Sequence, residues 1–259
     1  MSTRFFARFN LQNSLARESF PARADILATM LEKSEDEIQT YLDEFEGTQL
    51  ENEKHLKKLF AKELEALRGK RVLFLGDSIT SDNLSYRTAV CRAASLDGID
   101  GSVSGATSSI LLGLAYTLIE KEKPDIVSLM IGANDSVSII KEGFHQISLS
   151  EYSRNVKEIV DFALEHCTKL ILFEITPVVE DLFEKNFHFS GKQHNKTIFE
   201  YNAVLKNISK EHGIELISND WLRDAENMIE LYEPDGLHLS KEGQRIFAAK
   251  WISAAAKII

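Results

Sequence analysis

The feature that most constrains the fold is an alternation of short apolar runs with amphipathic stretches, which begins near Lys70. The apolar runs occupy 71–75 (RVLFL), 125–131 (DIVSLMI), 170–175 (LILFEI) and, more weakly, 214–217. Between them, apolar residues recur at helical spacing over 108–121, 150–166, 195–212 and 241–256. Strands that alternate with helices predict an α/β fold, with a mostly parallel sheet covered by helices on both faces.

The residues before Lys70 follow a different pattern, with apolar residues at helical spacing almost throughout. This pattern predicts three helices, over 23–33, from Ser34 to Gly47 and from Leu50 to Arg68. Ser34 and Glu37 have the spacing of a capping box, and glycines such as Gly47 and Gly69 commonly end helices. The sequence therefore predicts a small helical extension at 1–69, followed by an α/β domain at 70–259.

Charge limits the classes of partner. The chain of 259 residues has a formal net charge of -10, which disfavours the basic face that a nucleic-acid reader needs. The predicted helices over 23–46 have the rhythm of a helix-turn-helix unit, but the second one reads SEDEIQTYLDEFE and is acidic. We therefore expect no nucleic-acid partner, and an extension that packs on the domain, forms a lid or contacts a second copy in a homo-oligomer.

The sequence also bears on location. No stretch approaches the roughly 20 apolar residues that span a bilayer, and the N-terminus has no apolar core typical of a signal peptide. Cys91 and Cys167 do not form a metal-type pair, and we expect both to be reduced. The cytoplasm is the expected compartment.

Ligands of an open α/β sheet bind outside the carboxyl ends of its strands. Ser78 lies there, in the pentapeptide Gly76-Asp77-Ser78-Ile79-Thr80 directly after the first apolar run. Gly76 allows a tight turn, and Ser78 at a helix start could be a nucleophile whose neighbouring N–H groups receive an oxyanion. A simple helix cap built from Asp77 and Ser78 is an equally common use of these residue types.

Two further motifs can supply oxyanion donors. Gly132-Ala133-Asn134-Asp135 follows the run at 125–131, and the Asn134 amide can donate to a developing negative charge. Asp135 is expected to cap the next turn. In Ser104-Gly105-Ala106-Thr107, the glycine lets the Gly105 N–H approach a ligand.

A base can come from Asp235-Gly236-Leu237-His238. The Asp235 carboxylate can fold back to orient the His238 imidazole in one tautomer, which leaves the other ring nitrogen to accept a serine proton. Each of these motifs is weak alone, but all four follow one another at loops where an α/β sheet places its site.

In this order the motifs resemble the four blocks of the SGNH (GDSL-type) hydrolase family, over about 71–259. The resemblance implies a flavodoxin-like three-layer α/β/α sandwich with a five-stranded parallel sheet. It implies Ser78 as nucleophile and His238, oriented by Asp235, as base. It also implies an oxyanion hole made by the Ser78 and Gly105 N–H groups and the Asn134 side chain. We expect Asp77 and Asp135 to support this site, and no cofactor or metal ion. Asp100 and Ala106 depart from the family's usual Asn and Asp.

The expected activity is that of a serine esterase, which forms an acyl-enzyme with a small ester, for which an acetylated carbohydrate is a weak preference. An acyltransferase with the same site and a silent binding module are the alternatives. The scattered His145, His188 and His194 lack the spacing of a zinc pair. In the long loop 178–195, three phenylalanines line a pocket or, as we prefer, anchor the loop: Phe183, Phe187 and Phe189.

Overall fold

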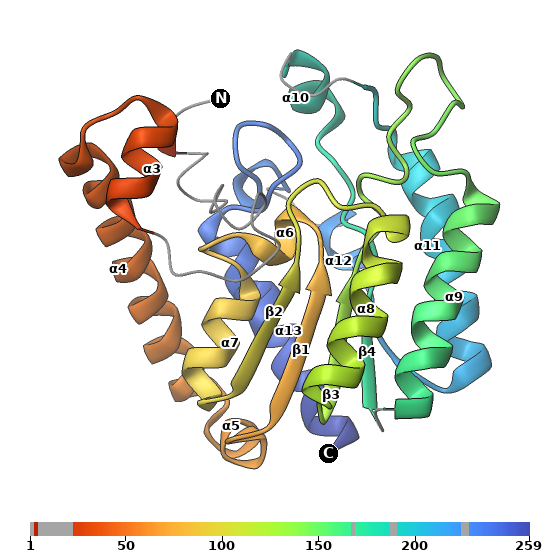
Figure 1. Cartoon of the computed structure of the whole chain (residues 1–259), viewed down its shortest axis with the longest axis horizontal. Helices are drawn as coiled ribbons and strands as arrows, with labels where there is room; N and C mark the ends of the chain where they lie inside the picture. The colour runs from red at the N-terminus through yellow and green to blue at the C-terminus, as the bar shows by residue number, and fades with distance from the viewer. Residues whose placement is uncertain (1–2, 5–22, 167–168, 187–190, 224–227) are drawn as a thin grey trace.

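A five-stranded parallel sheet forms the centre of the molecule (Figure 1). The computed structural model describes residues 3–4, 23–166, 169–186, 191–223 and 228–259. The strand order is β2-β1-β3-β4-β5. The strands are β1 (Arg71–Gly76), β2 (Asp97–Ser102), β3 (Ile126–Met130), β4 (Lys169–Phe173) and β5 (Glu215–Ile217). The order reverses between β1 and β3, which is where such sheets open a crevice for ligands.

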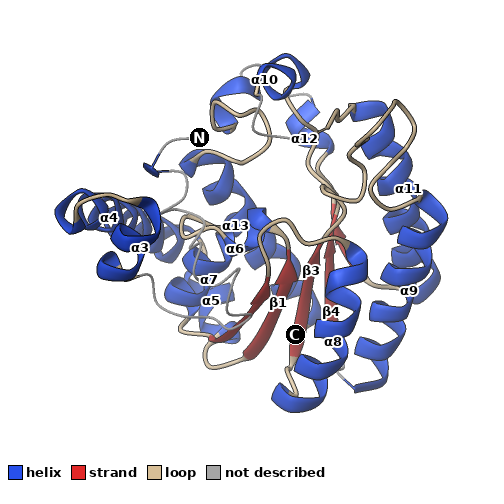
Figure 2. Ribbon diagram, turned by 45° about the horizontal axis from the view of Figure 1, so that its top comes forward, coloured by secondary structure: helices blue, strands red, loops and turns tan. Residues whose placement is uncertain are grey.

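Helices cover both faces of the sheet, so that the molecule has three layers (Figure 2). One face carries α8 (Ser108–Glu122), α9 (Leu149–His166) and α11 (Asn195–His212). The other carries α5 (Ala61–Leu67), α7 (Tyr86–Ala94) and α13 (Lys241–Ile258). Side chains of β1 alternate between the two layers, because successive residues of a strand point to opposite faces. The predicted α/β/α sandwich is confirmed.

The four predicted strands correspond to β1, β3, β4 and β5. The fifth strand, β2, was implied only by the family resemblance, because its sequence DGIDGS has no apolar run. It lies at the edge of the sheet and pairs with β1 alone. The helix α7, which precedes it, was not predicted either.

The predicted boundary between the second and third helices is wrong. Gly47 lies inside α4 (Glu35–Leu59), a single helix of 25 residues that also contains the predicted start of the third helix at Leu50. The third predicted helix is instead interrupted at Phe60, before α5 begins. A glycine inside a helix costs about 1 kcal/mol relative to alanine. Packing of the buried residues that precede and follow Gly47 in α4, such as Phe45 and Leu56, outweighs this cost. The start was predicted correctly, since the Ser34 side chain accepts a hydrogen bond from Glu37 N at 3.2 Å.

The helical extension packs against the sheet. Its first described long helix, α3 (Ala24–Leu31), forms a small cluster with α4. Leu56, at the end of α4, and Leu64 and Leu67 of α5 belong to the same apolar cluster as β1. These helices therefore contribute to the main core, and the domain boundary at 69 stays a prediction.

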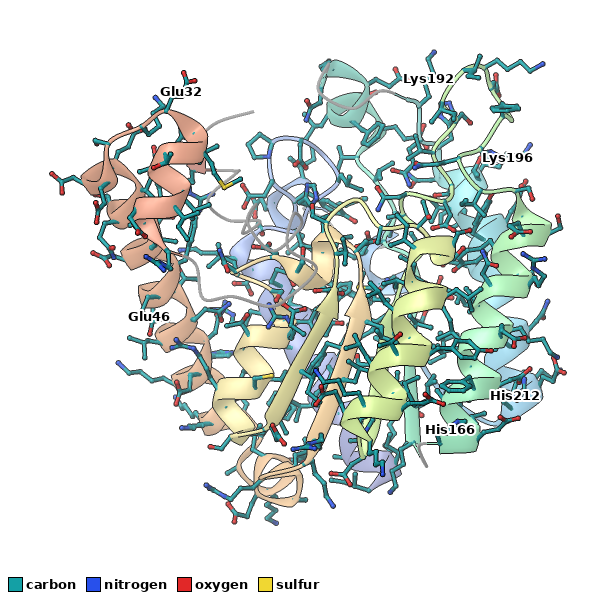
Figure 3. The ribbon with its side chains drawn as sticks, in the orientation of Figure 1. Glu32, Glu46, His166, Lys192, Lys196 and His212 are labelled. Atoms are coloured by element: carbon teal, nitrogen blue, oxygen red, sulfur yellow. The ribbon has the colours of Figure 1, made fainter. Side chains whose placement is uncertain are left out.

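The carboxyl ends of the strands all face one edge, at the top of Figure 1. In the described ranges, the remaining helices are short: α6 (Ser78–Ser81), α10 (Glu180–Lys185), α12 (Asp220–Arg223) and the 3-10 helix η1 (Met228–Leu231). Lys192 and Lys196 lie towards this edge in Figure 3, whereas His166 and His212 lie at the opposite one. In the described part of the chain, no helix combines the length and apolar character needed to cross a membrane.

Candidate active site

Ser78 is the first residue of α6 and lies directly beyond the end of β1. Asp77 is the N-cap of this helix, and its carboxylate accepts a hydrogen bond from Ile79 N at 3.0 Å. Gly76 is needed for space, because a Cβ there would lie 2.2 Å from Thr80 Oγ1 and 2.9 Å from Met130 O. Its φ is not positive, so the glycine is required here for space and not for a left-handed backbone conformation.

A continuous series of hydrogen bonds joins Asp235, His238 and Ser78. Asp235 Oδ2 lies 2.7 Å from His238 Nδ1, and His238 Nε2 lies 2.8 Å from Ser78 Oγ. The second carboxylate oxygen of Asp235 accepts hydrogen bonds from Leu237 N and His238 N, both at 2.9 Å. This carboxylate therefore holds both the ring and the backbone of the histidine turn.

Burial and charge have opposite effects on the pKa of Asp235, which is 8% exposed. Burial raises the pKa of Asp235, but the neighbouring His238 and hydrogen bonds from His238 and two backbone N–H groups hold it below its ordinary value. The ionised carboxylate is thus favoured next to the imidazole. Such a carboxylate fixes the Nδ1–H tautomer and leaves Nε2 as the acceptor that faces the serine.

Asn134 and Gly105 lie in two neighbouring loops that a hydrogen bond ties together. Asn134 Nδ2 donates to Ala106 O at 2.9 Å, which leaves the second hydrogen of the amide for another acceptor. Gly105 is exposed and has a φ of 78°, a conformation that favours glycine. Among the described residues, no hydrogen bond of the Ser78 or Gly105 N–H is found.

The Asp135 carboxylate caps the start of a helix and not, as we predicted, the turn that follows it. Both of its carboxylate oxygens accept from Ser108 N, at 3.0 and 3.1 Å, at the start of α8. The N-cap of α8, Thr107, makes no side-chain cap, so Asp135 supplies the missing acceptor at the positive end of the helix. The carboxylate thereby fixes the loop that carries Asn134 to the helix that follows Gly105.

Two buried carboxyl groups next to the proposed donors hold protons unusually strongly. Burial raises the pKa of Asp77 to about 7, against the opposing effects of the Ile79 N–H and of His238. Burial likewise raises the pKa of Asp135 to about 6, although Ser108 opposes the shift. Titration of both groups thus falls close to neutral pH.

The two departures from the family pattern have local explanations. Asp100 pairs with Arg87, whose Nη2 lies 3.1 Å from Asp100 Oδ2, and its other oxygen accepts from Ser102 N at 3.0 Å. Ala106 is fully buried, and its carbonyl is the acceptor for Asn134. Asp100 therefore stabilises the end of β2, and Ala106 links the loop around Gly105 to Asn134.

Gln193, which no sequence motif indicated, braces the Asn134 loop. Its side chain is buried, and Nε2 donates to Ala133 O at 2.7 Å and to Ser136 Oγ at 2.9 Å. Lys192 also pairs in antiparallel fashion with Ser138. Hydrogen bonds thus connect the end of the long loop 178–195 to the segment that follows Asn134.

The remaining candidate residues from the sequence lie in and outside the loop 178–195. Phe183, in α10, is buried in the apolar cluster that also contains α8, α9 and α11, as expected of an anchor. His194 lies 3.3 Å from Glu180 Oε2, and His145 packs edge-on against Tyr201. Three residues lie outside those described, Phe187, His188 and Phe189, as does Cys167. Within the described ranges, no three His, Cys, Asp or Glu side chains are grouped to hold a metal ion.

The comparisons with known proteins identify the family. The GDSL-like lipase/acylhydrolase family matches residues 74–246. A human protein, the isoamyl acetate-hydrolyzing esterase 1 homolog, is 26% identical over 204 residues, which cover 72% of this chain and 82% of that protein. The rat protein of the same name is 26% identical over 198 residues, which cover 70% and 80%.

Solved structures share the fold. A lipase/acylhydrolase from Enterococcus faecalis has a TM-score of 0.59 at 21% identity and covers 72% of this chain and 96% of its own. Axe2, an acetylxylan esterase from Geobacillus stearothermophilus, has a TM-score of 0.56 at 21% identity and covers 74% and 96%. Catalytic mutants of Axe2, in which a serine, an aspartate or a histidine is replaced by alanine, are also similar. The chain therefore belongs to the GDSL-like lipase/acylhydrolase family and is a carboxylic ester hydrolase.

Proposed function

We propose that the chain hydrolyses small acetyl or other short-acyl esters through an acyl-enzyme formed on Ser78. The hydrogen-bonded series from Asp235 through His238 to Ser78 carries this proposal. A serine hydroxyl is a weak nucleophile until a base removes its proton, and His238 Nε2 is at the distance for that transfer. The named catalytic mutants of Axe2 affect the same three residue types, which supports the assignment by analogy.

In the first half of the reaction, Ser78 Oγ bonds to the carbonyl carbon while its proton passes to His238 Nε2. The carbonyl π electrons move to oxygen and give an oxyanion. When the oxyanion collapses, the bond to the alcohol oxygen breaks and that oxygen takes the proton from His238. The imidazolium formed in between is stabilised by the Asp235 carboxylate.

In the second half, His238 removes a proton from water as the water oxygen attacks the acyl carbon. Collapse of the second oxyanion breaks the bond to Ser78 Oγ, which takes the proton back, and the carboxylic acid leaves. The Ser78 and Gly105 N–H groups and the second Asn134 amide hydrogen would stabilise both oxyanions.

Two relatives motivate the choice of acyl group. The human relative's name refers to isoamyl acetate, and the structural relative Axe2 is named for acetylxylan. Both names denote acetyl esters, although the alcohols differ in polarity. We therefore propose an acetyl group or another short acyl group for this chain, and an acetylated carbohydrate as one alcohol class to test.

The test uses purified protein and p-nitrophenyl esters of increasing acyl length. We expect the highest kcat/KM with acetate and almost no turnover by Ser78→Ala. Ser253→Ala, on the exposed side of α13, is the control for loss of a serine hydroxyl and should retain activity. Equal activity of Ser78→Ala and the wild type would refute the nucleophile.

The same protein separates the two alternatives. Acyl transfer would yield an acylated sugar or alcohol in place of free acid when acceptors are added, and chromatography of the products distinguishes them. A silent binding module would not react with a fluorophosphonate probe at Ser78. Labelling of Ser78, located by peptide mass spectrometry and lost in Ser78→Ala, would rule it out.

A further inference from the structure

Two buried glutamines from opposite ends of the chain converge on the segment that follows Ser78. This segment, 79–86, leads from α6 into α7 and is called here the nucleophile segment. Its link to Ser78 is direct, because Asp82 N donates to Ser78 O at 3.1 Å. Gln49, on α4, contacts it from one side, and Gln244, on α13, contacts it from another.

Gln49 binds backbone carbonyl groups of the nucleophile segment. Its Nε2 donates to Asn83 O at 2.8 Å and, more weakly, to Ser85 O at 3.4 Å. The side chain is 2% exposed, and its own oxygen accepts from Asn52 Nδ2 at 3.5 Å. Both functional ends of this amide are therefore used inside the protein.

Gln244 acts as a bridge across the same segment. Its Oε1 accepts from Tyr86 N at 2.9 Å, and its Nε2 donates to Ile79 O at 3.1 Å. His238 lies in the turn that leads into α13, so this helix ties the histidine turn to the serine turn. Gln244 thus connects the nucleophile segment to the helix that follows His238, whereas Gln49 connects the same segment to α4.

The position of Gln49 on α4 is unusual for a glutamine. The buried residues of this helix follow one stripe, and Gln49 and Asn52 are its only polar members: Ile38, Phe45, Gln49, Asn52 and Leu56. Burying an amide is unfavourable unless it is hydrogen-bonded, whereas an apolar side chain would cover α7 without that cost. The hydrogen bonds to Asn83 and Ser85 are what the amide supplies that an apolar residue cannot.

Apolar and charged contacts fix α4 at this place. Phe45 is buried against Leu84, in the middle of the nucleophile segment. Glu46, labelled in Figure 3, lies one residue along α4, and its Oε2 accepts from Arg92 Nη2 of α7 at 2.5 Å. Together with Leu56, which is buried further along the helix, these contacts anchor α4 on both sides of Gln49.

We propose that α4 of the helical extension is a positioning element for the nucleophile, and that Gln49 is its positioning residue. This inference rests on the proposed role of Ser78. Gln49 touches neither substrate nor reacting atoms. It fixes the carbonyl groups of Asn83 and Ser85, and thereby the orientation of the helix turn from which Ser78 Oγ points at His238.

The experiment compares Gln49→Ala with Gln39→Ala in the full chain. Gln39 lies on the exposed side of the same helix and bonds only to Asp43 among the described residues. We expect Gln49→Ala to lower kcat for p-nitrophenyl acetate by at least about tenfold with KM within about twofold, because small misplacements of a reacting group are costly. Gln39→Ala should match the wild type. Rates are normalised to the sites that a fluorophosphonate labels and are measured well below each Tm.

A second variant separates positioning from stability. Gln49→Glu keeps the shape, but its carboxylate faces carbonyl oxygens and cannot donate. Burial raises the pKa of such a carboxyl, so it regains a donor proton as the pH falls. The ratio of the variant's kcat to that of the wild type should therefore rise between pH 8 and pH 5.5.

The outcomes are distinguishable. An unchanged kcat in Gln49→Ala, or a loss that only follows its Tm, would overturn the positioning role, as would a pH-independent ratio for Gln49→Glu. If instead Ser78→Ala stayed active, the proposed nucleophile itself would fail. An inactive Ser78→Ala together with a fully active Gln49→Ala would refute the positioning role of Gln49 and leave the proposed nucleophile unaffected.

Discussion

His238 Nε2 lies 2.8 Å from Ser78 Oγ, although 160 positions separate the two residues in the chain. The fold explains the approach, because Ser78 follows β1 and the turn of His238 reaches the same edge of the sheet before α13. Asp235, only three positions from His238, completes the series from the other side of the ring. The three side chains thus come from the start of α6 and from one turn, and their alignment depends on how these two segments are held.

Replacing Asp235 with Asn should abolish most activity without unfolding the protein. The Asn oxygen can still accept from Leu237 N and His238 N, but its NH2 would donate to His238 Nδ1. That contact favours the tautomer with a proton on Nε2, which cannot accept the Ser78 proton. We expect kcat to fall on the order of 10³- to 10⁴-fold. Steady-state kinetics at pH 7.5 measure the loss, and a fall of less than tenfold would contradict the role of Asp235.

Replacing Asn134 with Ala tests the proposed oxyanion hole. Loss of one such donor typically lowers kcat about 100- to 1,000-fold, with little change in KM. Asn207→Ala, on the exposed side of α11, is a control that should behave like the wild type. If Asn134→Ala raised KM and left kcat intact, the amide would bind the ground state and not the oxyanion.

How much of this site was predictable depends on the kind of signal. The motifs of Ser78 and Asn134 stand directly after apolar runs, and Asp235 and His238 share one short turn. The α/β pattern was therefore enough to predict that these residues meet at one edge of the sheet. The partner of Asp135 did not follow, because its hydrogen bond to Ser108 spans 27 positions and depends on how two loops meet.

The sequence pattern did not predict which polar residues of the helices are buried. Gln49 and Gln244 resemble solvent-facing residues of amphipathic helices, and only the tertiary structure reveals that both are buried. Edge strand β2 was missed for a related reason. Its glycines at 98 and 101 leave room for Cys91 and Leu118, so close packing of neighbours took the place of an apolar run in this strand.

The buried Asp77 carboxyl makes a prediction about stability and pH. Its pKa is raised from 3.8 to about 7 in the folded state, so the folded protein binds this proton more tightly than the unfolded chain does. The stabilisation from this group is therefore complete below about pH 4 and is lost as the pH rises to about 7. At about 1.4 kcal/mol per pKa unit, the loss is at most about 4 kcal/mol.

Asp77→Asn removes this titration but retains an acceptor for Ile79 N. Relative to the wild type, the variant should therefore gain stability between pH 4.5 and pH 7.5. Urea unfolding at the two pH values gives the comparison. A difference between the two proteins that stays constant with pH would show that Asp77 is not protonated in the folded state.

The last prediction concerns Gly236, which lies between Asp235 and His238 and has a φ of 73°. A Cβ there would lie 2.7 Å from Val179 O and 2.8 Å from Leu182 Cβ, because the turn packs directly on the start of α10. Gly213 has a similar φ of 66° but has open space around its Cβ position, at the far end of α11. The two glycines therefore separate backbone strain from steric overlap.

Gly213→Ala should cost about 1–2 kcal/mol of unfolding free energy from backbone strain alone and should leave kcat unchanged. Gly236→Ala should cost at least twice as much and also lower kcat, because relief of the overlap must move either α10 or the turn that holds His238 against Ser78. Urea unfolding and steady-state kinetics on both variants measure the two effects. Equal losses of stability, with normal kcat in both, would mean that α10 yields freely and has no part in fixing the histidine turn.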